Sequence, residues 1–311
     1  MHLFIDPLYP DEGPCVTFKL IHQLPTQSVR DVLLRHLEMT MLMHPSFNFP
    51  TFKRRVEALF DPILFSPGSP PTESEKPHVG GAAALAKRPS LAFFAATVGG
   101  LALGARVASS SISHSSPTPQ SERGETSPPG EASALPYSAD ALFLLSTQAL
   151  AVAEFNQNYD LDHISAVLLN GLFLLHDGKQ RVAHTIYPTI GKLVNIAKMM
   201  GLHIDPDEFP GKYTLYDAEC RRRSWWDVYY YDLFMSDCMG QEPLIDDNTC
   251  TTRLPADVDE DAFHPGSETL PPPRQESNFA YFRQKCRCAM TLAQYFGVSP
   301  TLMLSYLAWH S

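Results

Sequence analysis

Two stretches decide the fold of this 311-residue chain: IGKLVNIAKMMGLHIDP at residues 190–206 and ECRRRSWWDVYYYDLFMSDCMGQEPLIDD at residues 219–247. Apolar residues recur every three or four positions from Ile190 to Met200, which predicts a helix. Gly201 stands where a helix C-terminus favours a left-handed residue, and Pro206 follows as a stop. The second stretch predicts a longer helix that carries three arginines and two tryptophans.

Helical spacing distributes the large side chains of the second helix over two neighbouring faces. The first face holds Arg222, Trp225, Tyr229, Asp232 and Ser236, and the second holds Trp226, Tyr230 and Leu233. Buried aromatics need partners for their polar tips, and we expect Arg222 and Asp232 to supply them. Glu219 and Arg223 stand four apart in the order that favours an ion pair.

The arginine triplet at residues 221–223 has two interpretations, a buried hydrogen-bond network or a basic and aromatic face for nucleic acid. The chain contains 24 Lys and Arg residues against 34 Asp and Glu residues, for a formal charge of −10. An acidic chain repels the phosphate backbone, and one triplet lacks the clustered footprint of a nucleic-acid binder. The sequence therefore favours the buried network and protein partners over direct contact with DNA.

The loop from His203 to Asp207 offers an imidazole and two carboxylates as candidate metal ligands. A metal site needs three or four converging ligands, and alternation in a loop is weak evidence for one. A helix C-terminus with a glycine, a histidine and then a proline explains the same residues structurally. We therefore assign no metal-ligating residue here.

The rest of the chain shows the same helical spacing, and no alternating strand pattern of useful length competes with it. Further apolar stripes lie at Val32, Leu33, Leu37 and Met41; at Phe52, Val56, Leu59 and Phe60; at Leu142, Leu145, Ala149 and Val152; and at Ile164, Val167, Leu168, Leu172 and Leu175. Asp140 and Asp162 are the predicted N-caps of two of these helices. The prediction is an all-α fold, a multi-helix bundle of packed helical pairs with about eight to ten helices.

Three stretches rich in Pro, Ser and Gly interrupt the helical pattern, at residues 66–90, 108–136 and 265–277. They cannot bury enough apolar surface to offset the entropy of ordering, so we expect disordered or surface loops. The second is longer than connections in compact domains usually are, which suggests an insertion between two packed helices. A single domain is predicted over residues 1–311.

Residues 91–108, LAFFAATVGGLALGARVA, are apolar enough to raise the question of a membrane span. A span needs about 20 apolar residues. This run is interrupted at Arg106 and contains Gly99, Gly100 and Gly104, which close helix packing explains. A buried helix is the better interpretation, and no membrane association is expected.

The six cysteines are scattered, which favours free thiols in a reducing compartment. A zinc cluster needs six cysteines in a tight array, whereas here Cys286 and Cys288 form the one close pair. The sequence also lacks a G-x-S-x-G elbow, a phosphate loop, a dinucleotide fingerprint and H-E-x-x-H. We therefore predict no enzyme and no cofactor in this chain.

The order of these motifs resembles the regulatory, or middle homology, domain of fungal zinc-cluster transcription factors, of the xylanolytic activator type. HPSFNFPTFKRR at residues 44–55 and the helix at residues 91–108 occupy the family's early positions. The residues that carry the resemblance most specifically are Gly201, Leu202, His203, Glu219, Arg222, Arg223, Trp225, Trp226 and Asp232. The chain departs from the family at Gln241 and Glu242, which stand where an arginine is expected.

The resemblance implies an α-helical regulatory module of a nuclear factor that controls RNA polymerase II transcription. It assigns DNA contact and zinc to a cysteine-cluster module that these residues do not contain, so either that module lies elsewhere or this is a stand-alone regulatory domain. Its partners would be proteins of the transcription machinery, and a small-molecule effector and a homodimer are compatible with it. The alternatives are a helical interaction scaffold without a transcriptional role, and an enzyme that uses a pocket between helices.

Overall fold

The computed structural model describes Phe4 and residues 14–61, 89–113, 137–156, 159–176, 182–273 and 279–295. These residues form nine α-helices and contain no β-strand. The helices are α1 (Phe18–Ile21), α2 (Gln27–Met41), α3 (Phe49–Leu59), α4 (Leu91–Ser113), α5 (Ala139–Phe155), α6 (Leu161–His176), α7 (Tyr187–Met199), α8 (Leu215–Met239) and α9 (Phe279–Tyr295). A π-helical segment, η4 (Val182–Ile186), leads into α7, and two 3-10 turns, η5 (Pro206–Glu208) and η6 (Asp247–Thr249), flank α8. The all-α prediction is confirmed.

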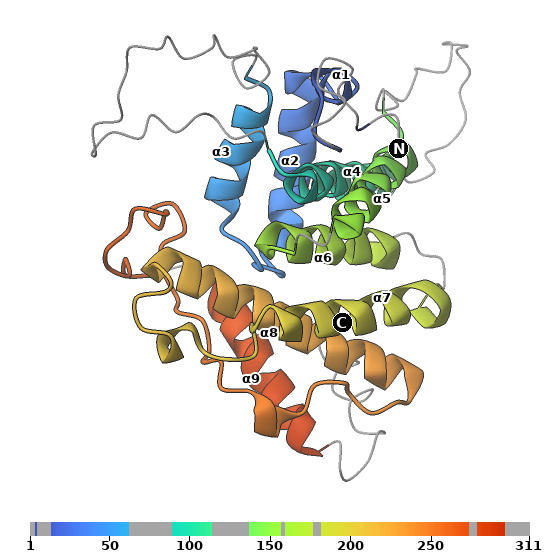
Figure 1. Cartoon of the computed structure of the whole chain (residues 1–311). Helices are drawn as coiled ribbons and strands as arrows, with labels where there is room; N and C mark the ends of the chain where they lie inside the picture. Colours follow the sequence, from blue (N-terminus) through green and yellow to red (C-terminus); the bar gives the residue numbers. More distant parts are fainter. Residues whose placement is uncertain are drawn as a thin grey trace, which may run out of the picture.

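The helices form two groups. In Figure 1, α1–α6 lie in the upper part of the molecule and α7–α9 lie in the lower part. Helix α4 is the centre of the first group, where α2, α5 and α6 pack against it, and α8 packs against both α7 and α9 in the second. Helix α6 also contacts α7 and α8 and so joins the groups. Buried apolar residues from all nine helices belong to one cluster, so the two groups share a core. The extent of the domain over residues 1–311 stays a prediction, since it includes residues outside the described ones.

Helix α4 is the apolar stretch that the sequence predicts to be a buried helix. Residues Leu91–Ser110 are long and apolar enough to cross a membrane, with a mean hydropathy of 1.7 over an 18-residue window, but 89% of that window is buried inside the protein. A Cβ atom on Gly104 would lie 2.2 Å from the carbonyl oxygen of Leu33, and one on Gly100 would lie 2.8 Å from Leu37 Cδ2. Glycine therefore lets α2 approach the backbone of α4, as predicted.

Two helices begin differently from the prediction. Ser138 caps α5, where its hydroxyl accepts from a backbone N–H, and Asp160 accepts from the backbone N–H of His163 at the start of α6. Asp140 and Asp162, the predicted caps, lie two residues later in the first helical turn. Their carboxylates instead form ion pairs of 2.6 Å with arginines of other helices. The cap predictions were therefore wrong, because a second polar residue precedes each aspartate.

The three predicted loops are described in part. Residues 62–88, 114–136 and 274–278 lie outside the described residues. Helix α4 continues to Ser113, so the prediction of a loop from residue 108 was wrong at its start. Ser109 and Ser110 donate their hydroxyls back to helical carbonyls four residues earlier, so both hydroxyls have a hydrogen-bond partner within the helix. Residues 265–273 form a mostly exposed loop.

The close approach of α2 to α4 predicts that Gly104→Ala destabilises the protein. The new methyl group collides with backbone that cannot rotate away, so we expect a loss of about 1–3 kcal/mol or more in the free energy of unfolding by urea denaturation. Gly171→Ala in α6 is the matched control, because a Cβ atom there meets nothing within 4 Å. The control should be neutral or stabilising by up to about 1 kcal/mol. Equal stability of the two variants would contradict the close packing.

Candidate functional site

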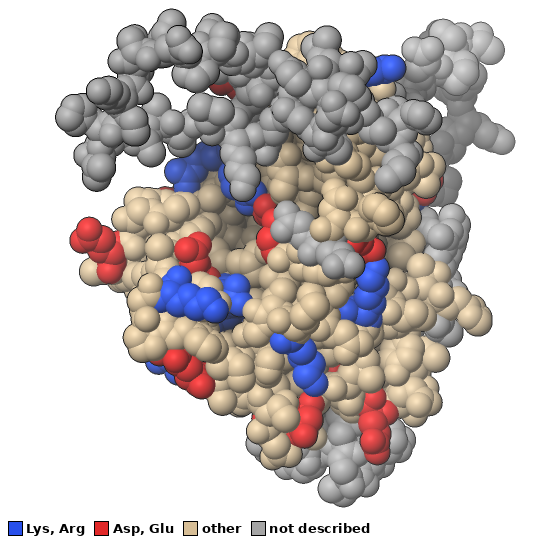
Figure 2. Space-filling view, viewed as in Figure 1, with Lys and Arg blue, Asp and Glu red and all other residues tan. Residues whose placement is uncertain are grey.

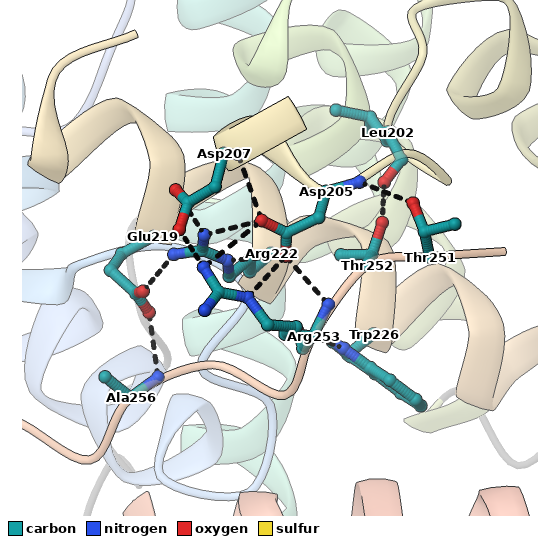
Figure 3. Close-up of polar contacts among 10 residues, drawn as sticks. All are labelled: Leu202, Asp205, Asp207, Glu219, Arg222, Trp226, Thr251, Thr252, Arg253 and Ala256. Atoms are coloured by element: carbon teal, nitrogen blue, oxygen red, sulfur yellow. Dashed lines mark hydrogen bonds and ion pairs between the residues drawn. The ribbon is translucent and has the colours of Figure 1, made fainter. Parts of the chain in front are cut away.

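The residues that carry the family resemblance gather around the connection between α7 and α8, shown in Figure 3. Helix α7 ends at Met199, and Gly201 follows in the turn with a φ of 71°. The N–H of Leu202 donates to the carbonyl of Ala197 at 3.0 Å, and that of Gly201 donates to Lys198 at 2.9 Å. These two bonds define a Schellman motif, which needs a left-handed residue at this position. The predicted helix stop is confirmed, and the turn directs the following loop against α8.

Arg222 of α8 lies at the centre of this site (Figure 3). Its Nε and Nη2 donate to the two carboxylate oxygens of Asp205 at 3.0 and 2.8 Å, and its Nη1 donates to Glu219 Oε1 at 2.5 Å. Nη2 also donates to Asp207 Oδ1 at 2.8 Å. The side chains of Arg222 and Asp205 are each 5% exposed and that of Glu219 is 3% exposed. A buried guanidinium is costly unless such partners surround it.

The segment after η6 completes the site and supplies a second arginine. The backbone N–H of Arg253 donates to Asp205 Oδ2 at 2.9 Å, and that of Ala256 donates to Glu219 Oε2 at 2.8 Å. The guanidinium of Arg253 pairs with Asp207. Three segments far apart in sequence therefore meet in one network. We call Asp205, Asp207, Glu219, Arg222 and Arg253 the arginine cluster.

Backbone contacts fix the loop and this segment to each other. The hydroxyl of Thr252 donates to the carbonyl of Leu202 at 2.7 Å, and the N–H of Thr251 donates to the carbonyl of His203 at 2.9 Å. The hydroxyl of Thr251 in turn accepts from the N–H of Asp205 at 3.0 Å. The carboxylate of Asp205 is thus held in place through its own backbone.

The electrostatics of Asp205 decide between the two interpretations of this loop. Burial alone would raise the pKa of Asp205, but hydrogen bonds from Arg222 and from the backbone of Arg253 and Asp207 lower it well below its usual value. The carboxylate is therefore ionised, and Arg222 and Arg253 already bind its two oxygens. The His203 ring lies 6.0 Å from the ring of Trp225, and the described residues contain no group of three or more His, Cys, Asp or Glu side chains suited to a metal. The structural interpretation fits this geometry.

The three successive arginines point to three different partners. Arg221 donates to the carbonyl of Met200 at 2.6 Å and so caps the end of α7. Arg223 is 0% exposed; its Nη1 lies 2.7 Å from Glu260 Oε1 and its guanidinium lies 4.5 Å from the Phe279 ring centroid. The predicted pair of Glu219 with Arg223 was wrong, because Glu219 turns to Arg222 instead. With two of the three arginines buried, the triplet is no surface for nucleic acid.

The tryptophans are buried as expected, at 1% exposure for Trp225 and 5% for Trp226. The polar tips of Trp226 and Tyr229 find partners in the chain after α8 rather than at Arg222 and Asp232. Trp226 Nε1 donates to the carbonyl of Arg253 at 2.8 Å, and the Tyr229 hydroxyl donates to Asp247 at 2.5 Å. Asp232 accepts the backbone N–H of Ile245 at 2.8 Å. The predicted partners were wrong, although the requirement for partners was correct.

The departure from the family pattern lies just beyond the end of α8. Gly240 has a φ of 62° and ends the helix. Gln241 and Glu242 follow and are exposed to solvent. The departure from the family pattern therefore lies on the surface and not in the core.

A second buried polar cluster was missed by the sequence analysis. Lys285 of α9 places its Nζ 3.0 Å from Asp227 Oδ1 and 3.2 Å from His44 Nδ1. The Tyr231 hydroxyl lies 2.9 Å from the same His44 nitrogen. We call His44, Asp227, Tyr231 and Lys285 the lysine cluster. Asp227 follows the two tryptophans directly, but Lys285 and His44 come from segments far from α8 in sequence, so spacing within one helix gives no signal for this cluster.

Burial and the neighbouring charge of Lys285 lower the pKa of His44 far below its ordinary value, with a further contribution from His176. His44 is therefore neutral in the folded protein. Burial raises the pKa of Asp227, which the lysine opposes through its charge and its hydrogen bond. The cluster ties α9 and α8 to the segment that follows α2.

The model for the fungal specific transcription factor domain matches residues 100–294 of the 311, which is more than half of the chain and includes the arginine cluster. The chain belongs to this family. The domain is a fungal transcription regulator domain, and its match begins within α4 and ends within α9.

Curated relatives are similar over shorter stretches. The chain is 38% identical over 89 residues to the C6 finger domain transcription factor hasF of Aspergillus fumigatus, covering 27% of this chain and 12% of that protein. It is 29% identical over 106 residues to the C6 finger domain transcription factor adaR of Aspergillus niger, covering 34% and 13%. It is 27% identical over 137 residues to the equisetin cluster transcription factor eqxF of Fusarium heterosporum, covering 43% and 19%. The chain therefore matches less than a fifth of each relative's length, and no solved structure is significantly similar to it.

Arg222→Met tests the arginine cluster. The substitution keeps the apolar length of the side chain but leaves Asp205 and Glu219 buried without their guanidinium. We expect a loss of about 3–5 kcal/mol in the free energy of unfolding, measured by urea denaturation. Arg35→Met on α2 is the matched control, since Arg35 is exposed and bonds to one backbone carbonyl at 3.3 Å. The control should stay within about 0.5 kcal/mol of the unmodified protein. A comparably small effect of Arg222→Met would show that the cluster does not support the fold.

His44→Gln tests the lysine cluster through pH. In the unfolded chain the histidine binds a proton below a pH of about 6.5, whereas folded His44 does not. The free energy of unfolding should therefore fall as the pH drops from 7 towards 5, by at most about 1.4 kcal/mol per pH unit from this group. Because His44→Gln removes this titration, its stability profile should be flatter.

The matched control for this pH series is His22→Gln, because His22 is exposed at the end of α1. Its profile should follow that of the unmodified protein. Buried His163 makes the same contribution to the pH dependence of unfolding in all three proteins, so it cancels in the comparison. Parallel profiles for His44→Gln and the unmodified protein would refute the buried neutral histidine.

Proposed function

We propose that this domain regulates a nuclear zinc-cluster transcription factor that controls RNA polymerase II transcription. The family match over residues 100–294 carries the proposal. DNA contact and zinc binding are assigned to a cysteine-rich module that lies outside residues 1–311. The narrower assignment to the xylanolytic activator type stays a prediction.

The chemistry of the described residues supports a regulatory role rather than a direct one on DNA. The chain is acidic, and two arginines of the conspicuous triplet are buried in ion pairs. Both polar clusters connect segments far apart in sequence, so they fix how the helices are arranged. Regulation requires that a partner or effector bind two arrangements with different affinity. The proposed partners are proteins of the transcription machinery, with a small-molecule effector and a homodimer as further components; catalysis is not proposed.

A transcriptional reporter tests this function directly. The chain is placed between a heterologous DNA-binding domain and an activation domain in yeast, and reporter output is compared with a fusion that lacks the chain. We expect the domain to change the output, Arg222→Met to return it towards the shorter fusion, and Arg35→Met to have no effect. Output that is indifferent to the domain would favour an interaction scaffold without a transcriptional role.

Localisation provides a separate test of the same proposal. A fluorescent fusion of the natural protein, expressed in its fungal host, should accumulate in nuclei. A signal that stays in the cytoplasm would contradict a nuclear regulator, whatever the reporter shows.

A further inference from the structure

A cleft of about 390 Å³ lies where the starts of α3, α6 and α8 meet, between the two groups of helices. Figure 2 shows the surface hollowed at this level, with basic and acidic side chains along the upper rim of the hollow. Clefts of about 300–1,000 Å³ are typical of small-molecule sites. The arginine cluster and the lysine cluster do not line this cleft, so it has no role in the contacts described above.

The charges that line the cleft favour a cationic ligand over an anionic one. Arg55 is already neutralised, because its two terminal nitrogens donate to the two oxygens of Asp162 at 2.7 and 2.6 Å. Asp160 and Asp217 also line the cleft. Each of the three helix starts contributes about half a positive charge, which together with Arg55 leaves the cleft negative by about half a charge.

Asp160 is the carboxylate best placed to receive a positive ligand group. Its Oδ1 accepts the backbone N–H of His163 at 2.8 Å, and none of the ion pairs among the described residues includes it. Burial and the neighbouring charge of Asp162 raise the pKa of Asp160. A cation that entered the cleft would therefore stabilise the ionised carboxylate of Asp160, which no positive side chain in the described part of the chain pairs with.

The remaining lining residues add a hydroxyl and an apolar wall. Ser46 is 1% exposed, and its hydroxyl has no hydrogen-bond partner among the described residues. A buried polar atom without a partner is uncommon and signals a missing interaction. Phe47 and Phe52, whose ring centroids lie 4.7 Å apart, form the apolar side of the cleft with Leu161. Carboxylate, hydroxyl and aromatic groups in one cleft suit an ammonium group attached to an apolar body.

We propose that this cleft binds a small organic amine, with its ammonium group at Asp160 and its apolar ring or chain against Phe47 and Phe52. The ligand would touch α3 and α6 of the first group and α8 of the second, so it stabilises the observed arrangement of the two groups over any other. That regulatory consequence rests on the proposed function, whereas the binding itself is a property of the isolated chain.

Isothermal titration calorimetry on the purified full chain tests the ligand class with three compounds that share one skeleton. These are phenethylamine, phenylethanol and phenylpropionate, which carry a positive, neutral and negative end. We expect saturable binding of phenethylamine, with the alcohol and the carboxylate weaker by about tenfold or more. Absence of saturable phenethylamine binding, or equal binding of the alcohol, would overturn the proposal.

Asp160→Asn locates the site without disturbing the fold, because asparagine keeps the oxygen that caps α6 while it removes the charge. Phenethylamine should bind this variant about tenfold more weakly. Asp140→Asn is the matched control, since Asp140 is likewise a carboxylate at the start of a helix but lies in the first turn of α5, outside the cleft. Unchanged binding by Asp160→Asn, or an equal loss in both variants, would place the amine elsewhere.

The binding assay and the transcriptional reporter test the two proposals separately, so either proposal can be refuted without the other. Amine binding without any effect of the domain on the reporter would keep the site and remove its regulatory role. An active reporter without amine binding would keep the regulatory domain and remove this ligand.

Discussion

The buried charge of Arg222 is the constraint on which the second half of the molecule depends. A guanidinium at 5% exposure is stable only when carboxylates and backbone groups replace its water. Those groups come from the loop after α7, from the preceding turn of α8 and, through shared carboxylates, from the segment that contains Arg253. One desolvated cation therefore holds in place two segments that lie outside the α-helices, the loop after α7 and the segment after η6.

The sequence was sufficient to predict the helices and much less of what connects them. Periodicity is a local property, so it correctly indicated an all-α fold and a buried α4, and Gly201 correctly marked the turn that follows α7. It also placed the large side chains of α8 on two neighbouring faces, whereas 17 of the 25 residues of α8 are buried. A helix surrounded on all sides gives no periodic signal about which neighbour each side chain meets.

The hydrogen-bond and ion-pair partners of α8 were also only partly predictable from the sequence. The sequence indicated that the arginines and aromatics of α8 need buried partners, and this was correct. It paired Glu219 with Arg223 because the two are four residues apart, whereas Arg223 reaches Glu260, which comes from a loop 37 positions further on. Lys285 and His44 could not be paired at all from spacing, since they are 241 residues apart. Such contacts follow from how the helices pack, which a one-dimensional pattern does not contain.

The contact between Lys285 and Asp227 favours two states of α9, one docked against α8 and one fully released into solvent. If α9 shifted by a few ångströms, the ammonium and the carboxylate would separate while both remained out of water, which is the least favourable arrangement for either charge. Full docking and full release, by contrast, each leave both charges solvated or paired. Helix α9 should therefore detach as a unit rather than slide along α8. A change in conditions that weakens its docking would shift the populations of the docked and released states, and not the position of the docked helix.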